Sequence, residues 1–190
     1  MKERVEIVAS GFGGQGVVRL GQILGQAAVK QGLHVTMLKS HGTEMRGGYV
    51  RSQVVMSPKL IDSPICESPD YFIALSLAAY NRFKDTVPEG GVILYDPAFV
   101  DKLDDGLPCR QLSVPAKQLS VEKFNRPIFA NTIILGALAR NLELLDKDIL
   151  LESVLDIITK FQTENRQAFE VGYDCVSDIG DQIDKASCRT

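Results

Sequence analysis

The spacing of apolar residues divides the start of the chain into strand, loop, helix and strand. Residues 4–9 alternate and are rich in β-prone side chains, which predicts a strand. Apolar residues then recur at helical spacing over 17–28, and Gly32 follows as a natural helix stop. A second β-prone run occupies residues 34–38. This order is that of one βαβ unit, and its length also matches.

Further apolar runs predict four more strands, and helical character dominates after about residue 115. Strands are expected over 49–56, 70–76, 92–96 and 109–114, with a short helix over 77–84 and a turn over 88–91. Three helices are expected over 131–145, 147–160 and 163–175, the first with Asn131 as its N-cap. We therefore predict an α/β fold, a Rossmann-like open sheet with helices on both faces and a helical C-terminal portion. It would form a single domain over residues 1–179, followed by a frayed tail over 180–190.

Composition and charge narrow the class of protein. The chain has 190 residues, 45% of them hydrophobic, and no apolar run reaches the length of a membrane span. Its first residues lack the features of a signal peptide, so a cytoplasmic protein is expected. The net charge of −3 is unevenly distributed, with +5 in residues 1–60 and −8 in residues 61–190. That asymmetry favours an anionic small ligand near the first third of the chain, and it is too mild to indicate nucleic acid.

The cysteines and histidines do not form a metal-binding pattern. Cys66, Cys109, Cys175 and Cys188 are far apart, and no C-x-x-C occurs. This argues against an iron–sulfur cluster or a structural zinc carried by this chain alone, and it favours free, mostly buried thiols. The only two histidines, His34 and His41, are too few for a histidine-based metal site.

The segment GFGGQG, residues 11–16, is a G-x-G-x-x-G motif between the first strand and the first helix. Backbone N–H groups at such a helix start favour an anion, and the glycines let a phosphate approach the backbone. The alternative is a tight strand-to-helix turn that binds nothing. Gly21 and Gly25 lie on one face of the following helix, where they would permit close packing on the sheet.

A typical NAD site has an acidic residue at the end of the second strand, and this chain lacks one. No Asp or Glu occurs between Glu6 and Glu44, and Lys39 stands where the acid is expected. A basic residue there disfavours NAD and suits a ribose that carries a phosphate, as in NADP or coenzyme A.

Other polar residues near the motif have two interpretations each. Gln15 either donates to a phosphate or braces the turn. Arg46, between Glu44 and the Gly47–Gly48 pair, either binds a phosphate or a partner or forms an ion pair with Glu44. Ser76 follows a buried strand at the sheet edge where ligands bind, but it also suits a helix N-cap. No catalytic constellation is present, so no catalytic residue is assigned.

Seven segments, spread over nearly the whole chain, together form a recognisable set. They are GFGGQGV (11–17), TEMRGG (43–48), the R-S-x-V strand (51–54), SP (57–58), SPDYFIALS (68–76), NTIILGAL (131–138) and NRQAFEVGY (165–173). The combination of G-x-G-G-Q-G with E-x-R-G-G is the most specific part of this set. Together the segments resemble the gamma subunit of 2-oxoacid:ferredoxin oxidoreductases, most closely the 2-oxoglutarate and 2-oxoisovalerate branch.

The resemblance implies a subunit of a complex that oxidatively decarboxylates a 2-oxoacid to an acyl-CoA and reduces ferredoxin. Thiamine diphosphate and iron–sulfur clusters would lie on the partner subunits, alpha, beta and possibly delta. This chain would help to bind coenzyme A as co-substrate, with residues 13–16 facing the pyrophosphate and residues 46–48 bordering the site. We add the inference that Lys39 lies near the 3′-phosphate, which the resemblance itself does not imply. The candidate binding residues are then Gly11, Gly13, Gly14, Gln15, Gly16, Lys39, Glu44, Arg46, Gly47, Gly48 and Ser76.

Three alternatives stay open at the level of sequence. One is a subunit of an indolepyruvate-type oxidoreductase, another is an NADP-binding reductase domain, and a third is a structural subunit with an empty glycine loop. The 2-oxoacid, the oligomeric state of the isolated chain, including a homodimer, and the completeness of the coenzyme site without partners also stay open. So do the roles of His41 and the four cysteines.

Overall fold

A computed structural model describes residues 3–41 and 49–187, and it describes side chains as far as residue 176, except that of His41. The strands are β1 (Val5–Phe12), β2 (His34–His41), β3 (Tyr49–Ser57), β4 (Tyr71–Ala74), β5 (Val92–Tyr95) and β6 (Arg110–Ser113). The α-helices are α1 (Val17–Lys30), α2 (Leu77–Phe83), α3 (Ala116–Phe124), α4 (Ala130–Asn141), α5 (Lys147–Ile157) and α6 (Gln162–Ser187). Two 3₁₀ turns, η1 (Lys84–Thr86) and η2 (Pro127–Phe129), precede β5 and α4.

The predicted strands and helices are confirmed, with shifted ends, whereas α3 was not predicted as a separate helix. Gly32 follows α1 with φ of 79°, and Gly91 N donates to Pro88 O at 2.9 Å in the predicted turn. Helix α6 continues to Ser187, past the expected end at residue 175 and into the segment for which we expected a frayed tail. The prediction that Asn131 caps a helix is wrong, since Phe129 occupies the N-cap of α4.

The six strands form one mixed sheet in the order β2-β3-β1-β4-β5-β6. Strands β1, β4, β5 and β6 are parallel, whereas β3 is antiparallel to both of its neighbours. The βαβ unit expected from residues 4–38 is therefore split, because β3 is inserted between β1 and β2. One consequence is that Lys39 on β2 lies a full strand further from the glycine loop than in a dinucleotide-binding fold.

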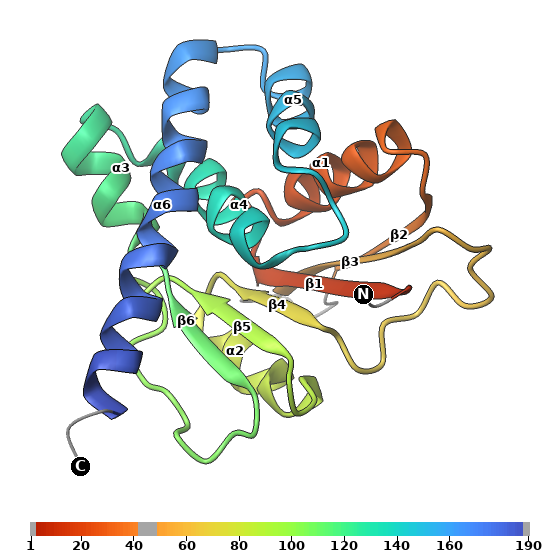
Figure 1. The fold of residues 1–190 in the computed structure, drawn as a ribbon, viewed down its shortest axis with the longest axis horizontal. Coiled ribbons are helices and arrows are strands. Elements are labelled where there is room, and N and C mark those ends of the chain that lie inside the picture. Colours follow the sequence, from red (N-terminus) through yellow and green to blue (C-terminus); the bar gives the residue numbers. More distant parts are fainter. Residues whose placement is uncertain (1–2, 42–48, 188–190) are drawn as a thin grey trace.

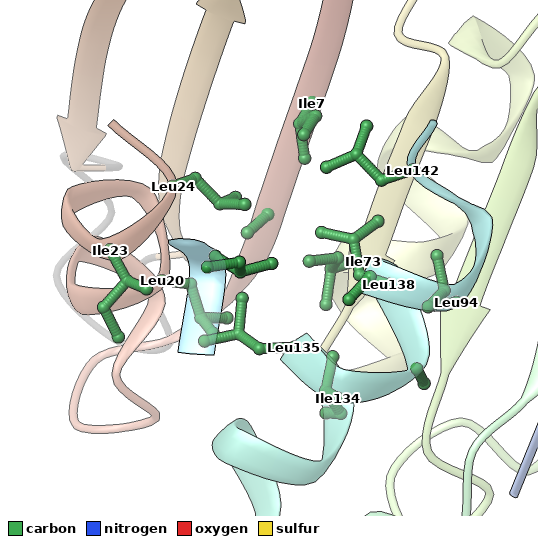
Figure 2. Close-up of a cluster of buried hydrophobic side chains, with 14 of the residues drawn as sticks. Ile7, Leu20, Ile23, Leu24, Ile73, Leu94, Ile134, Leu135, Leu138 and Leu142 are labelled. Carbon is green, nitrogen blue, oxygen red and sulfur yellow. The ribbon is translucent and has the colours of Figure 1, made fainter. Parts of the chain in front are cut away.

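Helices cover both faces of the sheet, as predicted, but unequally. Helices α1, α4, α5 and α6 pack on one face, where they bury the larger hydrophobic cluster (Figure 1). Helix α2 packs on the other face around Tyr80 and Phe83. Figure 2 shows the larger cluster where α1 and α4 meet the sheet, with Leu20 and Leu24 facing Ile73 and Leu138. This packing fixes the start of α1 relative to the start of α4.

Glycines allow two close approaches between elements. A Cβ on Gly21 of α1 would lie 2.8 Å from the Met37 methyl group and 3.2 Å from Ser52 Cβ, so this glycine packs directly on the sheet as predicted. Gly25 does not share that role, because nothing lies within 4 Å of a Cβ there. Helices α4 and α6 touch through Gly136 and Gly172, each of which faces the backbone of the opposite helix.

Cys66 and Cys109 are both buried and form no disulfide. Cys66 is 7% exposed, and burial raises the pKa of its thiol to about 12; burial also raises the pKa of Cys109. Because the thiolate is the reactive form, Cys66 should resist a thiol reagent such as DTNB at pH 8 until the protein unfolds. Counting thiols before and after denaturation checks this, with Cys66→Ala as the reference. Loss of a native-state signal in Cys66→Ala would contradict it.

Candidate functional site

The glycine loop connects the end of β1 to the start of α1 in a tight, left-handed turn. Gly14 and Gly16 have φ of 88° and 77°, and Gln15 N donates to Phe12 O at 3.2 Å. Gly16 is the N-cap of α1, and no side chain caps it. The first turn of the helix contains no acidic residue, and Arg19 lies there instead. Within the described residues, the first N–H groups of α1 therefore lack a side-chain partner, although they attract negative charge.

The Gln15 side chain braces the loop from within. Its Oε1 accepts a hydrogen bond from Phe12 N at 2.5 Å, and its Nε2 donates to Leu75 O at 2.8 Å. The two bonds join the loop to the end of β4. Gly11 lies beneath this side chain, where a Cβ would come within 2.8 Å of Leu75 Cβ. Of the two interpretations of Gln15, the bracing of the turn is the one seen here.

Asn131 of α4 reaches across to the same loop. Its Nδ2 donates to Gln15 O at 2.8 Å, over a separation of 116 residues. A Cβ on Gly16 would collide with that amide. The residue that local propensity marked as a helix cap is thus a tie between the glycine loop and α4.

A cavity of about 450 Å³ opens between the glycine loop and α4. Its volume lies in the range of about 300–1,000 Å³ that is typical of small-molecule sites. The loop contributes Gly14, Gln15 and Gly16, and the segment that joins α5 to α6 forms another wall. The apolar part of the lining consists mainly of Leu20, Ile23, Leu75, Phe99, Ile128, Phe129, Ile134, Leu135 and Phe161.

Four cations surround this cavity. Arg19 and Lys160 line it directly. Lys117 Nζ lies 5.1 Å from the ring centre of Phe99, and Arg126 Cζ lies 5.0 Å from that of Phe161; both rings line the cavity. None of the four forms an ion pair with any residue that the structure describes. An apolar cavity with unpaired cations around it suits an amphiphilic anion.

Asp96 is a cavity residue that sequence analysis treated only as a strand end. It is 1% exposed, and its Oδ1 accepts from Ala98 N at 2.9 Å while Oδ2 accepts from Lys117 N at 2.8 Å. The carboxylate thereby ties the end of β5 to the start of α3. This tie positions Phe99 and Lys117 beside the cavity.

The structure brings together only part of the predicted site. Gly14, Gln15 and Gly16 line the cavity, whereas Gly11 lies beneath the loop and Gly13 is exposed. Ser76 is buried and caps α2, with its Oγ accepting from Ala79 N at 3.2 Å, and Lys39 is exposed on the edge strand β2. The remaining predicted residues, Glu44, Arg46, Gly47 and Gly48, lie outside the described residues.

The part of the chain that the structure describes has neither a metal-binding cluster nor a membrane-spanning helix. Among the side chains that the structure describes, no group of three His, Cys, Asp or Glu residues lies close enough to hold a metal ion. Over residues 3–41 and 49–187, no helix is long and apolar enough to cross a membrane.

Comparison with known proteins identifies the family. Residues 6–175 match the model of the pyruvate ferredoxin/flavodoxin oxidoreductase family. The 2-oxoglutarate synthase subunit KorC of Methanocaldococcus jannaschii is 37% identical over 183 residues, which cover 94% of this chain and 97% of that protein. Relatives of this kind, together with a ketoisovalerate oxidoreductase subunit VorA that is 36% identical over 151 residues, confirm the predicted resemblance to the 2-oxoglutarate and 2-oxoisovalerate branch. They do not support the indolepyruvate-type or NADP-reductase alternatives.

Solved structures of similar fold point to the same family. The gamma subunit of a keto/oxoacid ferredoxin oxidoreductase from Geobacter sulfurreducens superposes with a TM-score of 0.79 at 30% identity, covering 90% of this chain and 96% of that one. A 2-oxoglutarate:ferredoxin oxidoreductase from Magnetococcus marinus, solved with 2-oxoglutarate, coenzyme A and succinyl-CoA bound, gives 0.78 at 26% identity. The match covers 92% of this chain but 31% of the Magnetococcus chain. The chain therefore belongs to the pyruvate ferredoxin/flavodoxin oxidoreductase family, as a gamma-type subunit of a 2-oxoacid:ferredoxin oxidoreductase.

Proposed function

We propose that this subunit contributes to coenzyme A binding through the cavity beside the glycine loop. In the overall reaction, a 2-oxoacid and coenzyme A give an acyl-CoA and carbon dioxide, and the two electrons released pass to ferredoxin. Thiamine diphosphate and the iron–sulfur clusters would lie on the alpha, beta and possibly delta subunits of a cytoplasmic complex. By analogy with the KorC relatives, the 2-oxoacid would be 2-oxoglutarate.

The observation that carries this proposal is the combination, at one cavity, of an apolar lining with cations that form no ion pair among the described residues. Coenzyme A has the matching chemistry, since its phosphates are strongly anionic while its adenine and pantetheine parts are largely uncharged. Phosphate groups would bind at the start of α1, where Arg19 and the uncapped N–H groups lie. Lys160, on another wall of the same cavity, would add a second charge.

Charge removal at the cavity tests the proposal. In the complex with its partner subunits, Arg19→Gln combined with Lys160→Gln should weaken coenzyme A binding about tenfold or more. The reason is that hydrogen bonds to charged groups contribute about 1.5–3 kcal/mol each. Isothermal titration calorimetry with coenzyme A measures this, and the loss should grow smaller at high salt.

Lys39→Gln is the matched control, because it removes one exposed cation from the sheet edge. We expect it to leave coenzyme A affinity unchanged, although Lys39 was the first choice from sequence for the 3′-phosphate. If Lys39→Gln weakens binding and the cavity variants do not, the coenzyme lies at the edge of β2 and this proposal is wrong. Dephospho-coenzyme A, titrated in parallel, identifies which cation contacts the 3′-phosphate.

A further inference from the structure

Phe161 adopts a backbone conformation that a bulky residue rarely takes. It lies between α5 and α6, and its φ of 57° is in the left-handed region. A bulky side chain there is an outlier that persists only where the surroundings hold it. Residues held in this way are concentrated at ligand sites.

Asn165 holds this conformation in place. Its side chain is buried at 3% exposure, and its Nδ2 donates to the backbone oxygens of Lys160 and Phe161, at 3.0 Å each. Its Oδ1 accepts from Thr132 Oγ1 at 2.7 Å, which connects the segment to α4. A buried and fully bonded amide thus fixes the backbone at Phe161 from the inside.

As a result, an aromatic residue at the cavity wall is held in a position that is exposed to solvent. Phe161 is 41% exposed as a residue and lines the cavity. The Arg126 guanidinium lies over the ring, and the ring of Phe129 meets it edge-on at 6.0 Å. Burial alone does not explain a strained backbone that leaves so much of a phenylalanine uncovered.

An exposed aromatic ring beside an unpaired arginine suits a planar, electron-rich group. Nucleobases stack on aromatic rings and on guanidinium planes, and phosphates on the ribose attached to the base are attracted by the same arginine. We propose that Phe161, backed by Arg126 and positioned by Asn165, is the stacking surface for the adenine base of a coenzyme A-type nucleotide. This inference rests on the proposed function, with the phosphates at the start of α1 on the same cavity.

Phe99 offers a second exposed ring on this cavity and a matched comparison. Phe99 is 40% exposed as a residue. The cation beside its ring is Lys117, a compact ammonium group that does not stack, and the φ of Phe99 is not positive. Phe99 therefore matches Phe161 in residue type, in exposure and in lining the same cavity. It lacks the positive φ and the neighbouring guanidinium of Phe161. The base should stack on Phe161 and not on Phe99.

The test uses the assembled complex and three ligands, namely coenzyme A itself and two compounds that represent its nucleotide part and its pantetheine part. Phe161→Leu keeps apolar volume but removes the flat ring, so affinity for coenzyme A and for adenosine 3′,5′-bisphosphate should fall about tenfold, equivalent to about 1.4 kcal/mol. Affinity for 4′-phosphopantetheine should not change. Phe99→Leu should leave the affinity for each ligand within about twofold. Calorimetric titration measures all three ligands.

Other outcomes overturn the assignment in distinguishable ways. Unchanged affinity for the bisphosphate in Phe161→Leu removes the stacking role while the cavity proposal stands, provided the Arg19 and Lys160 variants still lose coenzyme A. If Phe161→Leu prevents subunit assembly but leaves ligand affinity unchanged, Phe161 contacts a partner subunit and does not stack on the base. No binding of coenzyme A to the native complex rejects the proposed function and this inference together.

Asn165→Ala tests the positioning role separately. It should lower bisphosphate affinity in the native background and add little in a Phe161→Leu background, because both changes act through the same ring. Additive losses would show that Asn165 does not act through Phe161.

Discussion

Replacing Gly172 by alanine should destabilise the protein by at least about 3 kcal/mol. The added Cβ would lie 2.6 Å from the carbonyl carbon of Ile133 and 2.9 Å from its Cα, deep inside van der Waals contact. The obstacle is helix backbone, which cannot rotate away as a side chain can, so α4 and α6 would have to separate. The same close approach occurs in the other direction, because Gly136 of α4 lies against the backbone of Phe169 and Tyr173 in α6.

Thermal unfolding measures this effect, with Gly25→Ala as the control. A change of 3 kcal/mol in a chain of 190 residues lowers Tm by about 10 °C. Gly25 is also a helical glycine, but nothing lies within 4 Å of a Cβ there. Alanine at Gly25 should raise stability by up to about 1 kcal/mol, because it favours the helix. An unchanged Tm in Gly172→Ala would mean that the two helices are not in contact as described.

Local patterns predicted the elements well because strands and helices are set by short-range periodicity. The alternation over residues 4–9 and the helical spacing over 17–28 needed no tertiary information, and both elements are present as β1 and α1. The order of the strands in the sheet could not be predicted in this way. Nothing within the β3 sequence indicates that it pairs antiparallel with strands from both ends of the βαβ unit, since strand order depends on contacts distant in sequence.

The same distinction separates the predicted and the missed parts of the site. The glycine loop was found because its motif is contiguous, whereas the cavity walls outside the loop and α1 come from residues 75 to 165. Asn131 was misread because its amide binds a carbonyl 116 residues away, and tertiary contact overrode its capping preference. One signal was available in the sequence, namely Arg19 in the first turn of α1 with no acidic residue near it. The positive φ of Phe161 had no such signal.

Gly16→Ala should destabilise the protein by about 2–4 kcal/mol, the second largest effect that we expect. It should also weaken the binding of coenzyme A. Two effects add at this position. A residue with a Cβ is strained at φ of 77°, and the Cβ would displace the Asn131 amide from its bond to Gln15 O. Losing that bond releases the loop from α4 and widens the cavity on the side where phosphate is proposed to bind.

Two other glycines of the loop separate these effects. Gly14 has φ of 88° but open space around a Cβ, so Gly14→Ala should show backbone strain alone, about 1–2 kcal/mol. Gly13 has open space and no positive φ, so Gly13→Ala should change neither stability nor affinity. Urea unfolding of the three variants should therefore rank Gly16 above Gly14 and Gly14 above Gly13. An equal loss at all three positions would contradict the role given to Asn131.

A double-mutant cycle between Gly16 and Asn131 isolates the steric part. Asn131→Ala alone removes the hydrogen bond and should destabilise the loop by about 1 kcal/mol. In that background the methyl group of Gly16→Ala meets no amide, so only backbone strain should remain. The combined loss should be smaller than the sum of the single losses by about 1 kcal/mol or more, which is the size of coupling expected for residues in contact. Simple additivity would mean that Asn131 does not press on Gly16, and that the cavity wall at this point is formed differently.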